Sequence, residues 1–238
     1  EYSDMKRLRV EEYLARFPDS RMNPDDHPEV FLPEKEDLAL PHRDRNTHKY
    51  SYGRALVVAG SVGFSGAPVL AANACEKSGA GLTTLMVPQD IYPIAAARCD
   101  GAVVTPLPSV AGCAAPEALE TILPALKRAN ACAVGPGFGT GDGSLEILSG
   151  MLKEAECPLV LDADAITILG KRPELFSLCR SRLILTPHEG EFRRIGGKTD
   201  QGRLNGVLSF TEEHPGVILL LKGYGTLICD GKTVSVNP

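Results

Sequence analysis

Short apolar runs alternate with longer mixed segments from residue 54 to the end of the chain. Within most of these runs the apolar residues are continuous rather than alternating with polar ones, which is typical of strands buried on both faces. Most of these runs end in, or are followed directly by, Gly, Asp, Thr or Lys. The pattern predicts strands over 54–60, 82–87, 131–134, 158–161, 182–185 and 217–221.

The segments between these runs have the length and composition of helices. They predict helices over 67–78, 145–156 and 201–213, the first ended by Gly79 and Gly81. Strands separated by helices indicate an α/β fold with three α/β/α layers around a mainly parallel sheet. Near the C-terminus, Asp230-Gly231 separates two β-rich runs and predicts an antiparallel hairpin after the parallel core.

Residues 1–46 differ in composition from the rest of the chain. They are rich in charge and contain Pro18, Pro24, Pro28, Pro33 and Pro41. This composition predicts a charged, Pro-rich lead segment or linker, followed by one domain over residues 47–238.

Composition narrows the class of protein. With 238 residues, a net charge of −5 and a pI near 5.6, the chain lacks the basic excess of a nucleic-acid-binding domain. It has no apolar run of about 18 residues, so we expect no membrane span. Its seven cysteines include no C-x-x-C pair, which predicts buried free thiols and a cytoplasmic location.

Ligands of open α/β sheets bind beyond the carboxyl ends of the strands, so the loops there are candidates for chemistry. Two of these loops, 60–67 and 135–144, are rich in glycine, which lets backbone N–H groups approach a phosphate. The first is equally well explained as a turn with Ser65 as a helix N-cap. For the second, its place at the carboxyl end of a strand favours a pocket lining over a mobile surface loop.

Three further loops carry polar side chains. Asp162 and Asp164 follow a predicted strand and could hold Mg²⁺ near phosphates, or could cap the next helix. Residues 186–189 fit a capping box from Thr186 to Glu189, which leaves His188 to face a pocket as a neutral hydrogen-bonding group. Residues 222–226 suit a nucleotide phosphate or base edge, or form only a tight turn between strands.

Taken in order, these motifs resemble those of the ADP/ATP-dependent NAD(P)H-hydrate dehydratase family, which has a ribokinase-like fold. The resemblance covers residues 47–238. It rests on His48-Lys49, Ala59-Gly60-Ser61, Ser78-Gly79-Ala80-Gly81, Gly135-Pro136-Gly137, Asp162-Ala163-Asp164, Thr186-Pro187-His188 and Lys222-Gly223-Tyr224-Gly225-Thr226. It implies a metabolite-repair lyase that uses ADP or ATP to dehydrate hydrated NADH or NADPH.

The resemblance also implies roles for individual residues. Ala67, Gly137 and His188 would contact the hydrated nicotinamide nucleotide. The adenine nucleotide would be contacted by Lys222, Gly223, Tyr224, Gly225 and Thr226. Tyr50 and Glu189 depart from the family pattern, which commonly has Gly and Pro there.

The family's catalytic Asp lies in a Gly-Ser-Gly-Asp motif that the 238 residues do not contain. We therefore expect the Asp and the last helices of the fold to lie beyond Pro238, and this fragment alone to be inactive. In the family mechanism that Asp activates the ring hydroxyl for phosphorylation, with Mg²⁺ at the phosphates, and elimination follows.

Two other functions fit the same loops. One is a small-molecule kinase of the same fold, acting on a vitamin precursor, and the other is a truncated nucleotide-binding protein without turnover. The resemblance further suggests a fused or separate epimerase domain as partner, and the sequence is compatible with a homo-oligomer.

Overall fold

The computed structural model describes residues 6–7, 29–33 and 42–237, and the chain divides into two compact units. One unit is continuous, Asp44–Leu183. The other, here called the split unit, combines Glu1–Arg43 with Ile184–Pro238. Within the described ranges, no helix is both long enough and apolar enough to cross a bilayer.

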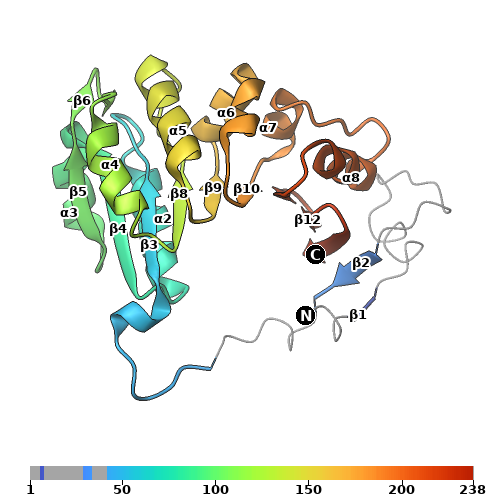
Figure 1. Ribbon diagram of the computed structural model, residues 1–238, viewed down its shortest axis with the longest axis horizontal. Coiled ribbons are helices and arrows are strands. Elements are labelled where there is room, and N and C mark those ends of the chain that lie inside the picture. Colours follow the sequence, from blue (N-terminus) through green and yellow to red (C-terminus); the bar gives the residue numbers. More distant parts are fainter. Residues whose placement is uncertain (1–5, 8–28, 34–41, 238) are drawn as a thin grey trace. The chain divides into compact units, whose positions relative to one another are not determined.

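A parallel sheet forms the centre of the continuous unit (Figure 1). Its strand order is β9-β8-β3-β4-β5. Every neighbouring pair in this order is parallel, as the continuous apolar runs predict. The strands are β3 (Arg54–Val58), β4 (Leu82–Pro88), β5 (Val103–Leu107), β8 (Ala131–Val134) and β9 (Leu159–Leu161).

The strand order reverses beside β3. From β3 the chain adds β4 and β5 on one side, and then returns to place β8 and β9 on the other. Such a reversal is a topological switch point, where the loops after two adjacent strands diverge and leave room for a ligand. We therefore expect a ligand to bind at the edge of the sheet where the loops after β3 and β8 lie.

Helices cover both faces of this sheet, as expected for three layers. α2 (Gly66–Lys77) and α3 (Tyr92–Arg98) pack on one face, where Val57, Leu85 and Val87 meet Val69 and Ala72 in one apolar core. Figure 1 shows α4 (Ala118–Leu126) and α5 (Asp142–Glu154) on the near side of the sheet. Right-handed crossovers in opposite directions from the switch point place helices on opposite faces.

Smaller elements complete the continuous unit. α6 (Asp164–Lys171) follows β9, and β6 (Ser109–Val110) and β7 (Cys113–Ala114) form a small antiparallel ribbon. Three 3₁₀ turns, η2, η3 and η4, span Lys49–Tyr52, Gln89–Ile91 and Pro173–Leu178. His48 lies at the start of η2 and is exposed, so the structure places it at the periphery.

The split unit contains the predicted hairpin. β11 (Val217–Leu221), β12 (Thr226–Cys229) and β13 (Thr233–Asn237) form an antiparallel meander. α8 (Arg203–Glu213) packs on it, and a Thr211 Oγ1–Cys229 Sγ contact of 3.2 Å joins the two. The shorter α7 spans Glu189–Arg194.

Residues 1–46, for which the sequence predicts a lead segment or linker, supply two short strands among the residues described. β2 (Glu29–Leu32) pairs in parallel with β13, and β1 (Lys6–Arg7) pairs with β2. Val30 and Phe31 are buried. The segment therefore shares in the core of the split unit at this point.

Several expected boundaries and elements need correction. The helix expected over 145–156 begins at Asp142, and the strand expected over 54–60 ends at Val58. The strand β10 spans Leu183–Leu185, one residue shorter than expected. The sequence pattern does not predict strand β5, because Thr105 and Pro106 interrupt its apolar run.

Candidate functional site

Two glycine-rich loops meet at the switch point of the continuous unit. The Gly60 N–H donates to the Pro136 carbonyl over 2.9 Å, which ties the loop after β3 to the loop after β8. Gly137 has φ +62°, and a Cβ there would lie 2.6 Å from Cβ of Phe64. Ala67 is half-buried in the first turn of α2. The structure thus brings the segments that carry Ala67 and Gly137 to one edge of the sheet.

The loop after β8 is anchored rather than loosely attached. Phe138 is buried, and its carbonyl accepts a hydrogen bond of 3.1 Å from the buried Ser144 hydroxyl. The Gly139 N–H donates to Oδ2 of Asp164 over 2.8 Å. These contacts fix the loop against α5 and α6, and its role in lining a pocket stays a prediction.

Asp162 and Asp164 lie at the end of β9, on either side of a strained residue. Ala163 has φ 51° and ψ −112°, a conformation that L-residues rarely adopt. Asp164 begins α6 and holds the Gly139 backbone, so it has a structural contact of its own. Among the described residues, no three His, Cys, Asp or Glu side chains gather into a metal-binding group.

His188 is the N-cap of α7, which corrects the capping box expected from Thr186 to Glu189. Its Nδ1 accepts hydrogen bonds from the N–H groups of Gly190 (3.0 Å) and Glu191 (3.3 Å). The Glu191 carboxylate in turn accepts from the His188 N–H over 2.9 Å. With Nδ1 occupied as an acceptor, the neutral ring carries its proton on Nε2, as a hydrogen-bond donor.

Glu191 is a buried carboxylate between two predicted site residues. Its Oε1 lies 3.5 Å from His188 Nε2, and its Oε2 lies 4.0 Å from Lys222 Nζ. Glu191 is only 6% exposed, whereas the His188 and Lys222 side chains are 55% and 40% exposed. The sequence shows Glu191 three residues after His188, but it does not show that the Glu191 carboxylate also lies near Lys222.

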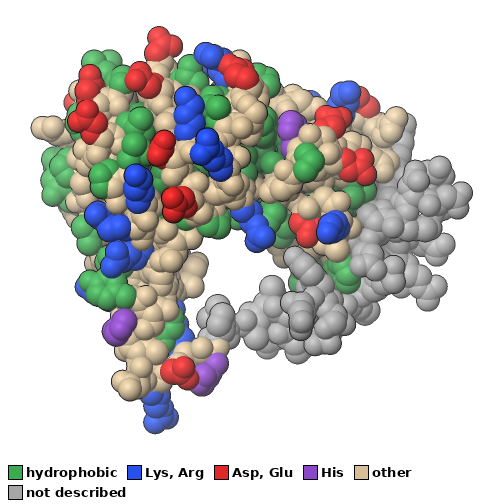
Figure 2. All heavy atoms as spheres, viewed as in Figure 1, with side chains coloured by type: hydrophobic (Ala, Val, Ile, Leu, Met, Phe, Trp, Pro, Cys, Tyr) green, Lys and Arg blue, Asp and Glu red, His purple; other side chains and the backbone are tan. Residues whose placement is uncertain are grey.

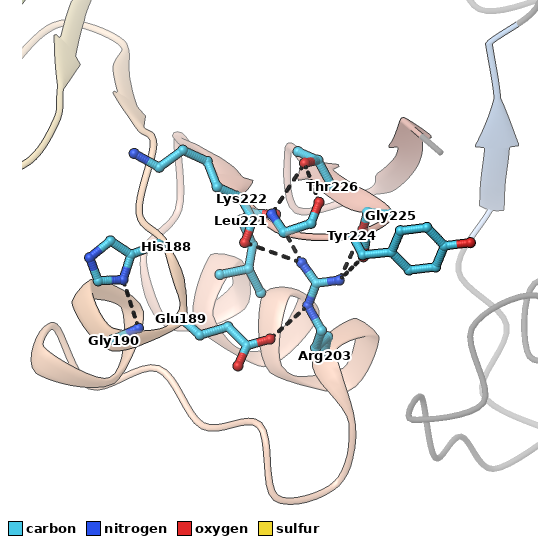
Figure 3. Close-up of polar contacts among 10 residues, drawn as sticks. His188, Glu189, Gly190, Arg203, Leu221, Lys222, Tyr224, Gly225 and Thr226 are labelled. Carbon is cyan, nitrogen blue, oxygen red and sulfur yellow. Dashed lines mark hydrogen bonds and ion pairs between the residues drawn. The ribbon is translucent and has the colours of Figure 1, made fainter.

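The turn 222–226 lies directly beside His188. The Lys222 N–H donates to the Pro187 carbonyl over 2.8 Å, and Lys222 forms a parallel β-bridge with His188. Thr226 closes the turn, because its hydroxyl donates to the Gly223 carbonyl and accepts from the Gly223 N–H. Tyr224 is 83% exposed, and Figure 3 shows its ring directed away from the other labelled residues.

Arg203, at the start of α8, is a residue that sequence reasoning missed. Its guanidinium donates to four carbonyls on or next to the turn, those of Leu221, Lys222, Tyr224 and Gly225 (Figure 3). Its Nε lies 3.2 Å from Oε1 of Glu189 in an ion pair that lacks hydrogen-bond alignment. The only sequence signal is an Arg at a helix start, where a basic residue is not favoured by the helix dipole.

The cysteines are free thiols, as the sequence predicts, but only Cys132, Cys157 and Cys229 are buried and the other four are half-buried. Burial is the main cause that raises the pKa of the thiols of Cys75, Cys99, Cys132, Cys157 and Cys229. A raised pKa suppresses the thiolate, which is the nucleophilic form. These five thiols are therefore poorly suited to nucleophilic catalysis.

Two concave surfaces lie away from the predicted residues. A pocket of about 230 Å³ in the split unit is lined by Lys198, Asp200, Asn205 and their neighbours. Another, of about 350 Å³, lies over β3, β4 and β5 in the continuous unit and includes Arg54 and Arg128. Figure 2 shows acidic and basic side chains interspersed over the visible face, in keeping with the modest net charge.

Comparison with protein families gives a match to NAD(P)H-hydrate dehydratase over residues 55–238. A bifunctional NAD(P)H-hydrate repair enzyme of Moorella thermoacetica is 36% identical over 206 residues, covering 84% of this chain and 38% of that protein. An ADP-dependent (S)-NAD(P)H-hydrate dehydratase of Neisseria meningitidis is 36% identical over 208 residues, covering 82% of this chain and 66% of that protein. The chain thus spans well under half of the bifunctional relative's length.

Solved structures give the same picture of the fold. A ribokinase-like superfamily protein of Enterococcus faecalis superposes with a TM-score of 0.75 at 24% identity, over 88% of this chain and 72% of that one. An ADP/ATP-dependent NAD(P)H-hydrate dehydratase of Bacillus subtilis, co-crystallised with ATP/Mg²⁺, has a TM-score of 0.69 at 27% identity, over 86% and 71%. The ribokinase-like α/β fold expected from the sequence is confirmed.

Proposed function

Because the chain belongs to the NAD(P)H-hydrate dehydratase family, we propose that it removes water from hydrated NADH and NADPH at the expense of ADP or ATP. The observation that carries this proposal is the family match over residues 55–238, which includes every predicted binding residue. The contact between the His188 turn and the 222–226 turn supports it, since His188, predicted to contact the hydrated nucleotide, lies there beside the residues predicted to contact the adenine nucleotide.

The geometry of the split unit suggests how two ligands would be held side by side. Lys222 offers an ammonium group that Glu191 draws toward His188, with an Nζ–Oε2 distance of 4.0 Å. A positive charge at this place suits a phosphate. His188, with its proton on Nε2, can donate to an oxygen of the hydrated nicotinamide nucleotide. In the continuous unit, Ala67 and Gly137 would contact the hydrated nucleotide through close backbone approach.

The chemistry is a phosphorylation followed by an elimination. The hydroxyl oxygen of the hydrated ring bonds to the terminal phosphorus, its proton passes to a base, and ADP or AMP departs from ATP or ADP. The ring nitrogen's electron pair then expels phosphate, and a proton lost from the neighbouring carbon restores the double bond. Binding both nucleotides in register supplies several kcal/mol of the barrier reduction, by an order-of-magnitude estimate.

Mg²⁺ fits this proposal only as a metal held largely by phosphate oxygens. Mg²⁺ usually keeps waters and takes one or two carboxylates together with substrate phosphates. The described residues offer the Asp162 and Asp164 pair rather than a larger cluster. When bound, the ion would neutralise charge on the transferring phosphoryl group.

Location and partners extend the proposal. Seven free thiols support a reducing compartment, and we propose the cytoplasm. The relative from Moorella thermoacetica is bifunctional, which supports an epimerase, fused or separate, that supplies the usable epimer. Association of this chain into a homo-oligomer stays a prediction.

Binding of ADP tests the nucleotide site on this chain directly. Titration calorimetry should show ADP binding to the wild-type chain, and Lys222→Ala should weaken it about tenfold or more, because a charge-assisted contact to phosphate is lost. Lys232→Ala is the matched control, since Lys232 is exposed in the hairpin turn of the same unit. Equal ADP affinity for Lys222→Ala and the wild type would refute the assigned site.

Turnover by the full-length gene product tests the reaction. Incubation with hydrated NADH and either ADP or ATP should restore the near-ultraviolet absorbance of NADH, and omission of the nucleotide should abolish the recovery. Phosphorylation of a vitamin precursor without recovery of NADH would favour the kinase instead. Nucleotide binding without either reaction would identify a non-catalytic binding protein.

A further inference from the structure

We propose that Arg203 is the positioning residue for the adenine-nucleotide turn, holding residues 222–226 in the conformation that receives the nucleotide. The proposal rests on the function proposed above for this turn. Its starting point is burial: the Arg203 side chain is only 14% exposed, although it lies in the first turn of a surface helix. A buried guanidinium needs several partners to offset its loss of hydration.

The partners are all backbone carbonyls of one segment. Nη1 donates to Tyr224 and Gly225 over 2.7 and 3.0 Å. Nη2 donates to Leu221 and Lys222 over 3.1 and 3.4 Å. The planar fork of a guanidinium can reach four acceptors in this way, whereas the single ammonium of a lysine cannot reproduce the arrangement.

These bonds fix the direction of the backbone donors in the turn. In a trans peptide the carbonyl and the following N–H point in opposite directions. With the Tyr224 carbonyl turned toward Arg203, the N–H of Gly225 points away from the guanidinium. The Gly225 N–H is therefore directed to the side of the turn opposite the guanidinium. A backbone donor held in this direction suits a phosphate or base edge on that side of the turn.

The close approach also explains a glycine in the turn. A Cβ added to Gly223 would lie 2.8 Å from Nη2 of Arg203, and Gly223 has φ +155°. A side chain here would collide with the guanidinium. Gly223 and Arg203 are therefore complementary parts of one arrangement.

Arg203 also connects the turn to Glu189, the residue next to His188 in the chain. Its Nε lies 3.2 Å from Oε1 of Glu189, which directly follows His188. Glu189 is 46% exposed, so the ion pair contributes little energy. Its charge partly balances the guanidinium, while the four carbonyl bonds set the geometry.

The experiment compares Arg203→Lys with Glu189→Gln and with Arg194→Ala, an exposed arginine of α7. Calorimetry should give an ADP dissociation constant about tenfold or more above wild type for Arg203→Lys. Glu189→Gln and Arg194→Ala should stay within about threefold. Hydrogen exchange should become faster in residues 222–226 of Arg203→Lys and remain unchanged in α5, a helix of the continuous unit.

Three outcomes separate this inference from its premise. Loss of ADP affinity together with faster exchange in the turn supports the positioning role. Wild-type ADP affinity in Arg203→Lys overturns it, because charge alone would then suffice. Failure of the wild-type chain to bind ADP at all overturns the proposed function, whatever Arg203 does.

Discussion

Replacing Gly135 with alanine should destabilise the continuous unit more than any surface glycine replacement. Gly135 follows β8 and begins the glycine-rich loop at the switch point. A Cβ there would lie 1.9 Å from the Asp162 carbonyl oxygen and 2.7 Å from Cβ of Ala165, whereas real Cβ contacts stay above 3.0 Å. Neither neighbour can move alone, because Asp162 directly follows β9 and Ala165 lies in α6.

The expected magnitude has two parts. Gly135 has φ +125°, and holding an L-residue in such a region costs about 1–3 kcal/mol. Moving the loop and α6 apart to admit the methyl group costs about 1–3 kcal/mol more, as other overpacked sites do. Together we expect a loss of about 2–6 kcal/mol in the free energy of unfolding, a large share of the stability of a typical domain.

Two other glycines separate these contributions. Gly63 has φ +89°, but a Cβ added there would have no atom within 4 Å, so Gly63→Ala should cost only the conformational part, about 1–2 kcal/mol. Gly141 has φ −78°, and its added Cβ would also have no atom within 4 Å, so Gly141→Ala should change stability by about 0.5 kcal/mol or less.

Urea denaturation of the three variants and the wild type measures the differences through the transition midpoint at constant slope. The expected order of stability is wild type and Gly141→Ala, then Gly63→Ala, then Gly135→Ala. If Gly135→Ala matched Gly63→Ala, the close approach of the loop to Asp162 would carry no energetic weight. The reasoning about a tightly packed switch point would then be wrong.

Two smaller changes test other parts of the structure. Burial raises the pKa of the Asp230 carboxyl, but hydrogen bonds from Thr233 and Lys232 outweigh it and lower the pKa below its usual 3.8. The ionised carboxylate therefore stabilises the hairpin fully at pH values above the usual pKa, and this stabilisation is lost as the pH falls through the lowered pKa of the folded state. Asp230→Asn removes the titrating group, so the free energy of unfolding of this variant should fall less steeply at acidic pH than that of the wild type. Ala163→Gly should stabilise the chain by about 1 kcal/mol in urea denaturation, because it relieves the strain of φ 51°; a loss of stability would contradict that strain.

The sequence predicts the buried strands of the parallel sheet well because their apolar signal is redundant. Val57 and Val58 are fully buried, as are Leu159 and Leu161, so no polar residue interrupts these strands. An edge strand lacks this constraint. Among the described strands β5 pairs with β4 alone, which lets it carry Pro106 and an exposed Val103, and its pattern resembles a loop.

The error at the start of α7 has a different cause. Residues 186–191 contain two overlapping capping patterns, Thr186 to Glu189 and His188 to Glu191. Propensity favours threonine as N-cap, because hydroxyls are common there and imidazoles are not. The fold selects His188, whose Nδ1 accepts two backbone N–H bonds, and this choice directs Glu191 toward Lys222. Tertiary contacts therefore determine where α7 begins, and local residue preference alone gives the wrong N-cap.

The role of Arg203 could not be predicted from the sequence, because its hydrogen-bond partners are backbone carbonyls and do not depend on residue type. Glycine-rich loops can be recognised from composition, and the turn 222–226 is recognisable in that way. The acceptors of Arg203 are main-chain carbonyls 18 to 22 residues away, which any amino acid would supply. Sequence patterns reveal which segments can approach a ligand, whereas the side chain that holds such a segment in place emerges only once the backbone is folded. A search for site residues in related chains should therefore begin from the carbonyls that face inward and ask which buried cation they meet.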